Sequence, residues 1–128
     1  MSRGLADTSI FIAAETRRAL SVASLPDEIA VSIVTIGELR AGVLAAEDVD
    51  TRDRRLTTLM SALQLQPIPV DESVADAWAR LRILLRENSL RMPVNDSWIA
   101  ATAIALGVPV LTQDDDYVQL PGLEVIRI

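Results

Sequence analysis

Three residue types that carry much of protein chemistry are absent from this sequence of 128 residues: cysteine, histidine and lysine. Without cysteine the protein has no disulfides, no thiol catalysis and no zinc–thiolate site, and without histidine it lacks the most common general base and zinc ligand. Phosphate-binding loops built around a lysine and Schiff-base chemistry are excluded as well. Carboxylates, hydroxyls and 12 arginines are what remain for chemistry.

Aromatic residues are scarce, at 3% of a chain that is 50% hydrophobic, so the core must be aliphatic. No apolar run reaches the ~18 residues of a membrane span, and the N-terminus lacks the apolar core of a signal peptide. We therefore expect one domain, residues 1–128, in the cytoplasm and away from membranes. The net charge of −6 argues mildly against nonspecific nucleic-acid binding. A carboxylate cluster that holds divalent cations would reverse that sign locally.

Short aliphatic runs alternate with segments of helical periodicity along the chain. Strands are expected at residues 4–6, 29–34, 67–70, 108–111 and 123–128. Helices are expected at residues 8–23, from residue 35 onward, and at 52–65, 72–89 and 98–106. Two prolines confine the 67–70 strand to an edge of the sheet. The alternation predicts an α/β fold, a three-layer α/β/α sandwich around a mainly parallel sheet.

The acidic residues of interest lie where these elements begin or end. Asp7 follows the first strand, Glu38 lies one turn into the helix after the second strand, and Asp114 follows a late strand. Asp96 lies at the start of the helix that precedes this late strand, and a helix runs antiparallel to the strand after it. All four carboxylates can therefore meet at the carboxyl edge of the sheet, where open α/β folds bind ligands.

Each acid also has a purely structural explanation. Asp7 and Asp96 can cap helices, and Glu38 follows Thr35 at the spacing of a capping box. The run 114–116 can be a solvated turn. Together, however, four converging carboxylates repel one another unless cations lie between them, and such hard oxygen ligands suit Mg²⁺ or Mn²⁺. Gly37 adds weight, because glycine in a first helical turn costs up to ~1 kcal/mol relative to alanine and its presence indicates close access.

Four stretches surround these acids in the expected order: ADTSIFIA, SIVTIGELRAG, VNDSWIAATAIALG and PVLTQDDDY. With them the chain resembles the PIN-domain family over nearly its whole length, and within that family the VapC-type toxins of bacterial toxin–antitoxin pairs. The resemblance implies catalytic, metal-binding roles for Asp7, Glu38, Asp96 and Asp114. It adds Asp116 as a further metal ligand. It also implies that the hydroxyl of Thr112 supports Asp114, and that Thr8 or Ser9 is the small polar residue that follows Asp7.

The resemblance further implies a Mg²⁺- or Mn²⁺-dependent endoribonuclease that hydrolyses RNA by metal-activated water, acting as the toxin of a type II pair. It implies a homodimer and a cognate VapB-type antitoxin, whose apolar segment would lie in a groove between the helices of residues 35–65. Arginines 17, 18, 40 and 91 are candidates for contacts with RNA phosphates, although a solvated helix surface explains any single one of them.

Three other classes of protein compete with this interpretation. A phosphoacceptor receiver domain needs a lysine that this chain lacks, and dehalogenase-type phosphatases need an Asp-x-Asp motif where this chain has Asp7, Thr8 and Ser9. The serious alternative is a PIN-like module that binds protein or RNA without cutting.

Overall fold

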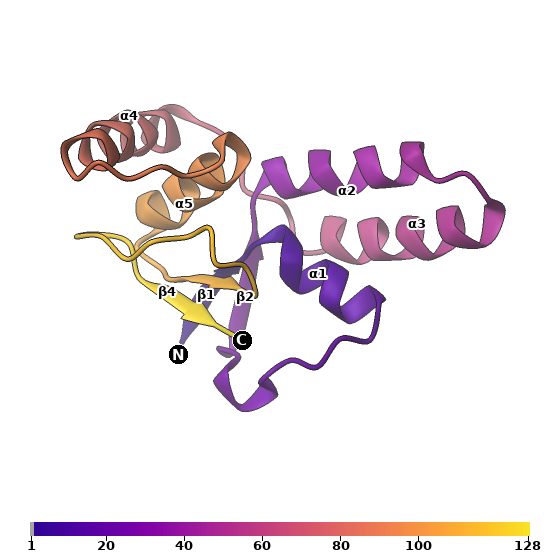
Figure 1. Cartoon of the computed structure of the whole chain (residues 1–128). Helices are drawn as coiled ribbons and strands as arrows, with labels where there is room; N and C mark the ends of the chain where they lie inside the picture. The colour runs from indigo at the N-terminus through magenta and orange to yellow at the C-terminus, as the bar shows by residue number, and fades with distance from the viewer. Residues whose placement is uncertain (1) are drawn as a thin grey trace.

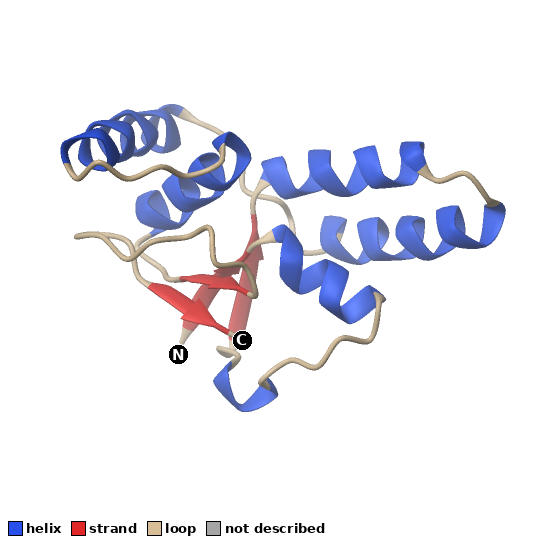
Figure 2. Cartoon of the chain, in the orientation of Figure 1, coloured by secondary structure: helices blue, strands red, loops and turns tan. Residues whose placement is uncertain are grey.

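The structure of the protein is a computed structural model that describes residues 2–128. Four strands form the sheet: β1 (Arg3–Ala6), β2 (Glu28–Val31), β3 (Val110–Thr112) and β4 (Val125–Arg127). The helices are α1 (Thr8–Glu15), α2 (Ile33–Ala45), α3 (Val49–Leu63), α4 (Glu72–Glu87) and α5 (Val94–Leu106), with a short 3₁₀ turn η1 (Val22–Ser24). Figures 1 and 2 show the strands at the centre with helices on either side.

The sheet has the order β2-β1-β3-β4, and all its strand pairs are parallel. Successive side chains of a strand point to opposite faces. Leu5 and Val110 accordingly join one core cluster with Ile99 of α5, whereas Ala6 and Leu111 join another with Ile10 of α1. The predicted α/β/α sandwich with a parallel sheet is confirmed, and the carboxyl ends of all four strands lie at one edge.

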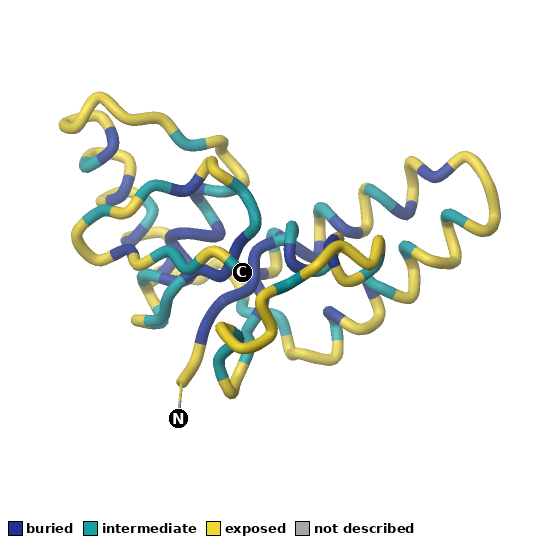
Figure 3. The backbone as a smooth tube through the Cα atoms, turned by 60° about the horizontal axis from the view of Figure 1, so that its bottom comes forward, coloured by how far each residue is buried: buried dark blue, intermediate teal, exposed yellow. Residues whose placement is uncertain are grey.

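Two helix pairs extend from this centre. Helix α4 packs on α5, and α2 packs on α3 in a hairpin that projects away from the sheet (Figure 1). The backbone in Figure 3 is buried mainly at the sheet and more exposed along the α2–α3 hairpin. No helix in the described part, residues 2–128, is long and apolar enough to cross a membrane.

Several element boundaries differ from those expected. The first helix ends at Glu15 instead of near residue 23, because Arg17 adopts a left-handed backbone (φ 59°) just past the C-cap Thr16. The second strand ends at Val31 instead of continuing to residue 34. There Ser32 caps α2 by accepting a hydrogen bond from the Val34 N–H. Thr35 is consequently inside α2, and the predicted capping box between Thr35 and Glu38 is wrong.

The remaining differences concern burial and strand length. On α3, Leu59 is buried but Leu56 and Met60 are exposed, because this helix packs mainly against α1 and α2 and leaves its other side to solvent. Leu44 of α2 is also exposed. The strand expected at 67–70 is reduced to a single bridge between Ile68 and Ser32. Gly107 ends α5 with a left-handed backbone, as its position predicts.

Candidate metal centre

Asp7 is the anchor of the site, directly after β1 and at the N-cap of α1. Its side chain is only 1% exposed, and both carboxylate oxygens are hydrogen-bonded. The Ser9 hydroxyl and N–H donate to Oδ1 over 2.6 and 3.1 Å, and the Thr112 hydroxyl donates to Oδ2 over 2.6 Å. Burial raises the pKa of Asp7 to about 6, although these hydrogen bonds lower it. The expectation that Asp7 caps a helix is confirmed, but the cap alone does not explain the bond from Thr112 of another strand.

Asp96 lies in the first turn of α5 and is not its cap. Pro93 occupies the N-cap position, and no side chain caps this helix. The interpretation of Asp96 as a helix cap is therefore wrong, and its half-buried carboxyl is free to face other groups. The pKa of Asp96 is raised to about 7. Burial is the largest cause, and repulsion from Asp7, Asp114, Asp116 and Glu38 raises it further. Repulsion from all four shows that Asp96 lies among the predicted acids.

Asp114 and Asp116 complete a cluster with Asp96. One carboxylate oxygen from each of the three lies within 4.8 Å of the others, although they come from α5 and from the loop after β3. The Asp114 N–H donates to the Thr112 hydroxyl over 2.8 Å, so Thr112 connects Asp114 to Asp7. Burial raises the pKa of Asp114, with further contributions from Asp116 and Glu38. The side chain of Asp115, between the two, instead pairs with Arg127.

Glu38 approaches the cluster from α2 and is held by two neighbours. The Thr8 hydroxyl donates to its Oε1 over 2.6 Å, and the Asn95 amide donates to Oε2 over 3.4 Å. The Thr8 hydroxyl also lies 3.1 Å from that of Thr35, a buried residue one turn before Glu38. The structure therefore brings residues of α1, α2 and α5 together around this carboxylate.

The donor set fits a hard divalent cation. It consists of carboxylates, with hydroxyls supporting them and no nitrogen or sulfur ligand, which matches the preference of Mg²⁺ and Mn²⁺. The raised pKa values of Asp7, Asp96 and Asp114 reflect burial and mutual repulsion that a cation would relieve. All five predicted acids thus lie at the carboxyl edge of the sheet, with Asp96, Asp114 and Asp116 closest to one another.

Two residues near the site were not identified from the sequence as site residues. The amide of Asn95 contacts Glu38. Tyr117 is 2% exposed, and its hydroxyl has no hydrogen-bond partner among the described residues. Burial raises its pKa, and repulsion from Asp7, Asp96, Glu38 and Asp114 adds to this. The one available signal was its position, as the only tyrosine of the chain, directly after three aspartates.

Comparison with known proteins places this geometry in a family. A sequence model of the PIN domain matches residues 5–123. The chain belongs to the PIN-domain family. This PIN domain is 49% identical over 128 residues to "Ribonuclease VapC5" of Mycobacterium tuberculosis, a match that covers 98% of this chain and 95% of the relative. It is 50% identical over 126 residues to "Ribonuclease VapC4" of the same organism, covering 98% and 97% of the two chains.

The fold comparison agrees. A crystal structure of VapBC-5 from Mycobacterium tuberculosis, a member of the VapBC family of toxin–antitoxin systems, superposes with a TM-score of 0.92. The superposition covers 100% of both chains at 45% sequence identity. The predicted resemblance to the PIN domains of the VapC group is confirmed.

Proposed function

We propose that this PIN domain is the toxin of a type II toxin–antitoxin pair and acts as a Mg²⁺- or Mn²⁺-dependent endoribonuclease in the cytoplasm. The observation that carries the proposal is the acidic cluster of Asp96, Asp114 and Asp116, backed by Asp7 and Glu38, at the carboxyl edge of the sheet. The names of the VapC5 and VapC4 relatives support ribonuclease activity. Cellular RNA is the substrate class, and the cytoplasm is where it is abundant.

The residues of this chain have distinct tasks in such a reaction. Asp7, fixed by Ser9 and Thr112, holds its carboxylate in one orientation, and Asp96, Asp114 and Asp116 surround the same space with negative charge. Glu38, held by Thr8 and Asn95, faces them from α2. A divalent cation bound there supplies the positive charge that activates a water molecule and stabilises the charge on a phosphodiester.

The composition favours hydrolysis by water over attack by the RNA's own 2′-hydroxyl. Cleavage through the 2′-hydroxyl usually relies on a histidine or lysine as acid and base, and this chain has neither. The expected products therefore carry a 5′-phosphate and a 3′-hydroxyl, which mass spectrometry of the cleaved RNA distinguishes from a cyclic phosphate.

The surface beside Glu38 supports docking of an antitoxin. A hollow of about 300 Å³ between α1, α2 and α3 is lined by Ile12, Leu39 and Glu38 itself, among others. A segment lying in this hollow would reach the carboxylates, and an arginine from it would compete with the cation. The likeness to VapBC-5, which belongs to a family of toxin–antitoxin systems, supports a VapB-type partner.

Exposed apolar side chains of the α2–α3 hairpin, Leu44, Val49 and Met60, support a homodimer. Co-expression with its cognate VapB-type antitoxin should yield a complex that survives purification. Light scattering should give a dimer mass for the toxin alone at micromolar concentration. Absence of the complex would contradict the antitoxin proposal, and a monomer mass would contradict the dimer.

The nuclease proposal is tested by exchanging single carboxylates for amides. Asp96→Asn and Asp114→Asn should each abolish cleavage of a structured RNA in Mg²⁺ or Mn²⁺, because an amide removes charge and changes ligand geometry at nearly constant size. Asp115→Asn is the matched control, since this acid pairs with Arg127, and it should cleave like the parent. A chelator should stop cleavage by the parent. Undiminished cleavage in chelator would contradict the metal dependence.

A parent protein that binds RNA but cuts nothing in any divalent cation would favour the second candidate, a PIN-like binding module. The intact acidic set argues against this candidate, because buried carboxylates that repel one another are costly unless they bind something.

A further inference from the structure

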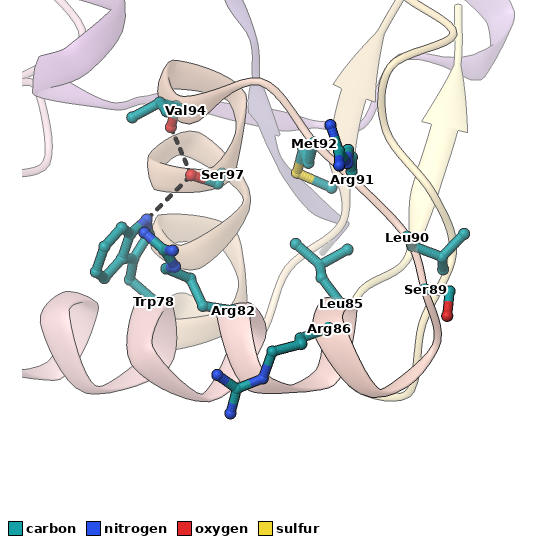
Figure 4. Close-up of a pocket in the computed structure, with 10 residues that line it drawn as sticks. All are labelled: Trp78, Arg82, Leu85, Arg86, Ser89, Leu90, Arg91, Met92, Val94 and Ser97. Carbon is teal, nitrogen blue, oxygen red and sulfur yellow. Dashed lines mark hydrogen bonds between the residues drawn. The ribbon is translucent and has the colours of Figure 1, made fainter.

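A groove of about 560 Å³ lies outside the acidic cluster, between α4, the segment 88–93 and the first turn of α5. Figure 4 shows its wall, with Trp78, Arg82 and Arg86 from α4, Arg91 and Met92 from the connecting segment, and Ser97 from α5. No acidic residue lines it among those the structure describes. None of the metal-site tasks described above uses this groove.

The groove is basic in a protein of net charge −6. Residues 77–95 contain four arginines and a single acid, Glu87. Arg82, Arg86 and Arg91 are exposed, and within residues 2–128 none of them forms an ion pair. Arg80 of the same helix differs, because it pairs with Asp76 over 2.9 Å. Three uncompensated guanidinium groups on one groove indicate an anionic occupant.

The groove also has an aromatic wall that is rigidly held. The rings of Trp78 and Trp98 stack with centroids 4.2 Å apart and planes 2° from parallel. The Trp78 indole N–H donates to the Ser97 hydroxyl over 3.0 Å (Figure 4). The Arg82 guanidinium lies 4.8 Å from the centroid of the Trp78 ring. Trp98 thus covers one face of the Trp78 ring and Arg82 covers the other, so the outer face of the Arg82 guanidinium is the planar surface on which an unpaired RNA base can stack.

The groove and the carboxylates lie at the same end of α5. The segment 88–93 runs from the end of α4 back to the start of α5 (Figure 1). Val94 and Ser97, which line the groove, belong to the same helical turn as Asp96. A helix with its side chains is about 10–12 Å across, so residues of one turn lie within about one helix diameter of each other.

We propose that this groove binds the single-stranded RNA segment next to the phosphodiester that is cut. Arg86 and Arg91 contact its phosphates, and a base stacks on the Arg82 guanidinium, which Trp78 supports from behind. This proposal rests on the proposed nuclease function and adds to it how the substrate is held. An acidic protein segment would satisfy the arginines, but it would leave the aromatic wall without a matching planar group.

The test measures RNA binding with the arginines removed singly and together. In an Asp96→Asn background, which prevents cleavage, fluorescence anisotropy is recorded with a short fluorescein-labelled single-stranded RNA of mixed sequence in Mg²⁺. Arg86→Ala and Arg91→Ala should each weaken binding several-fold. Each lost phosphate contact should also reduce the slope of log affinity against log salt by about 0.7. Arg80→Ala, on the same helix but ion-paired outside the groove, is the matched control and should bind like the background protein.

Cleavage kinetics of the same arginine substitutions in the active protein separate this proposal from the nuclease proposal. A higher KM with an unchanged kcat supports the groove as a substrate subsite. Unchanged RNA affinity and KM in the double variant would overturn the groove proposal, while Asp96→Asn could still abolish cleavage and leave the nuclease proposal intact. A loss of dimer or antitoxin complex in the double variant, with RNA affinity unchanged, would also overturn it and assign the groove to a protein partner.

Discussion

At the scale of single residues, one buried hydroxyl connects the two halves of the candidate metal centre. The Thr112 hydroxyl donates to Asp7 and accepts from the Asp114 N–H, with the Ser9 hydroxyl a further 3.3 Å away. The single proton of the Thr112 hydroxyl is donated to Asp7, and that of the Ser9 hydroxyl is donated to the other oxygen of the same carboxylate, so the two hydroxyls are neighbours that share Asp7 as their acceptor. Thr112 thereby fixes the end of β3 relative to the end of β1.

Thr112→Val is expected to reduce cleavage strongly and to move its pH dependence upward. Valine has the same shape but gives no hydrogen bond, and because this bond lowers the pKa of Asp7, its loss raises that pKa above about 6. Less Asp7 is then ionised at neutral pH, so the rising limb of the pH–rate profile shifts to higher pH. The unpaired Asp114 N–H costs about 1–3 kcal/mol of stability.

Thr112→Ser is the control for that prediction, since it keeps the hydroxyl and should keep both the profile and most of the activity. Equal pH–rate profiles for the valine and serine variants would contradict the positioning role of Thr112, whatever their stabilities.

The sequence predicted the acidic residues of the centre better than the residues that hold them. Asp7, Asp96 and Asp114 could be placed at one edge because strand and helix ends follow from local pattern. The contact of Asn95 with Glu38 joins residues 57 positions apart, and the pairing of Thr8 with Thr35 joins residues from different helices. Such contacts depend on how the helices pack, and a single sequence carries little signal for them.

At the scale of elements, local propensity identified the helices and strands but misplaced several of their ends. Residues 29–34 are rich in β-branched side chains and read as one strand, yet Ser32 caps a helix in the middle of that run. The chain after α1 has no glycine or proline to end the helix. The segment after α1 is held instead by Gln113, whose side-chain amide donates to the Ala19 carbonyl over 2.9 Å. A local cap at Ser32 therefore sets the first of these boundaries, and the left-handed backbone of Arg17 together with the contact of Gln113 sets the second.

Two glycines at helix positions give a matched pair of predictions. A Cβ at Gly37 of α2 would meet no atom within 4 Å, so Gly37→Ala should raise the free energy of unfolding by roughly 1 kcal/mol. A Cβ at Gly107 meets nothing either, but its φ of 70° is left-handed, so Gly107→Ala should lower stability by about 1 kcal/mol. Urea unfolding of both variants measures the difference.

The activity of Gly37→Ala adds a second readout, because the sequence predicted that something needs close access at this position. A variant that is more stable but cleaves poorly would support that interpretation. Equal destabilisation of both glycine variants would contradict the assignment of open space at Gly37.

At the scale of the whole molecule, the carboxylates cost the metal-free protein stability. The pKa values of Asp7 and Asp96 are about 6 and about 7 in the folded protein, against an ordinary 3.8. Between about pH 4 and pH 7 the folded protein thus binds more protons than the unfolded chain, so its free energy of unfolding falls as pH rises through this window. In chelator the melting temperature should be higher at pH 5 than at pH 8.

Asp96→Asn removes one of these charges and separates a metal centre from a set of ordinary caps and turns. If the acids served only local structure, asparagine would change little, because it caps helices about as well as aspartate. In a converging site, two charges ~5 Å apart at an effective dielectric of ~20 repel by about 3 kcal/mol before salt and relaxation reduce this. We therefore expect Asp96→Asn to melt a few degrees above the parent in chelator at pH 8. This difference in melting temperature should become smaller toward pH 5, where the Asp96 carboxyl of the parent is protonated.

Added Mg²⁺ should reduce or reverse the difference in melting temperature between Asp96→Asn and the parent. The cation binds the folded parent and stabilises it by mass action, so the parent's melting temperature rises with Mg²⁺ concentration while that of Asp96→Asn changes much less. The two melting curves, recorded by calorimetry at pH 8, should converge or cross as Mg²⁺ is added. Asp115→Asn, which alters an acid paired with Arg127, should follow the parent at every concentration. Equal melting temperatures for Asp96→Asn and the parent in chelator, with equal responses to Mg²⁺, would show that these carboxylates do not act as one site.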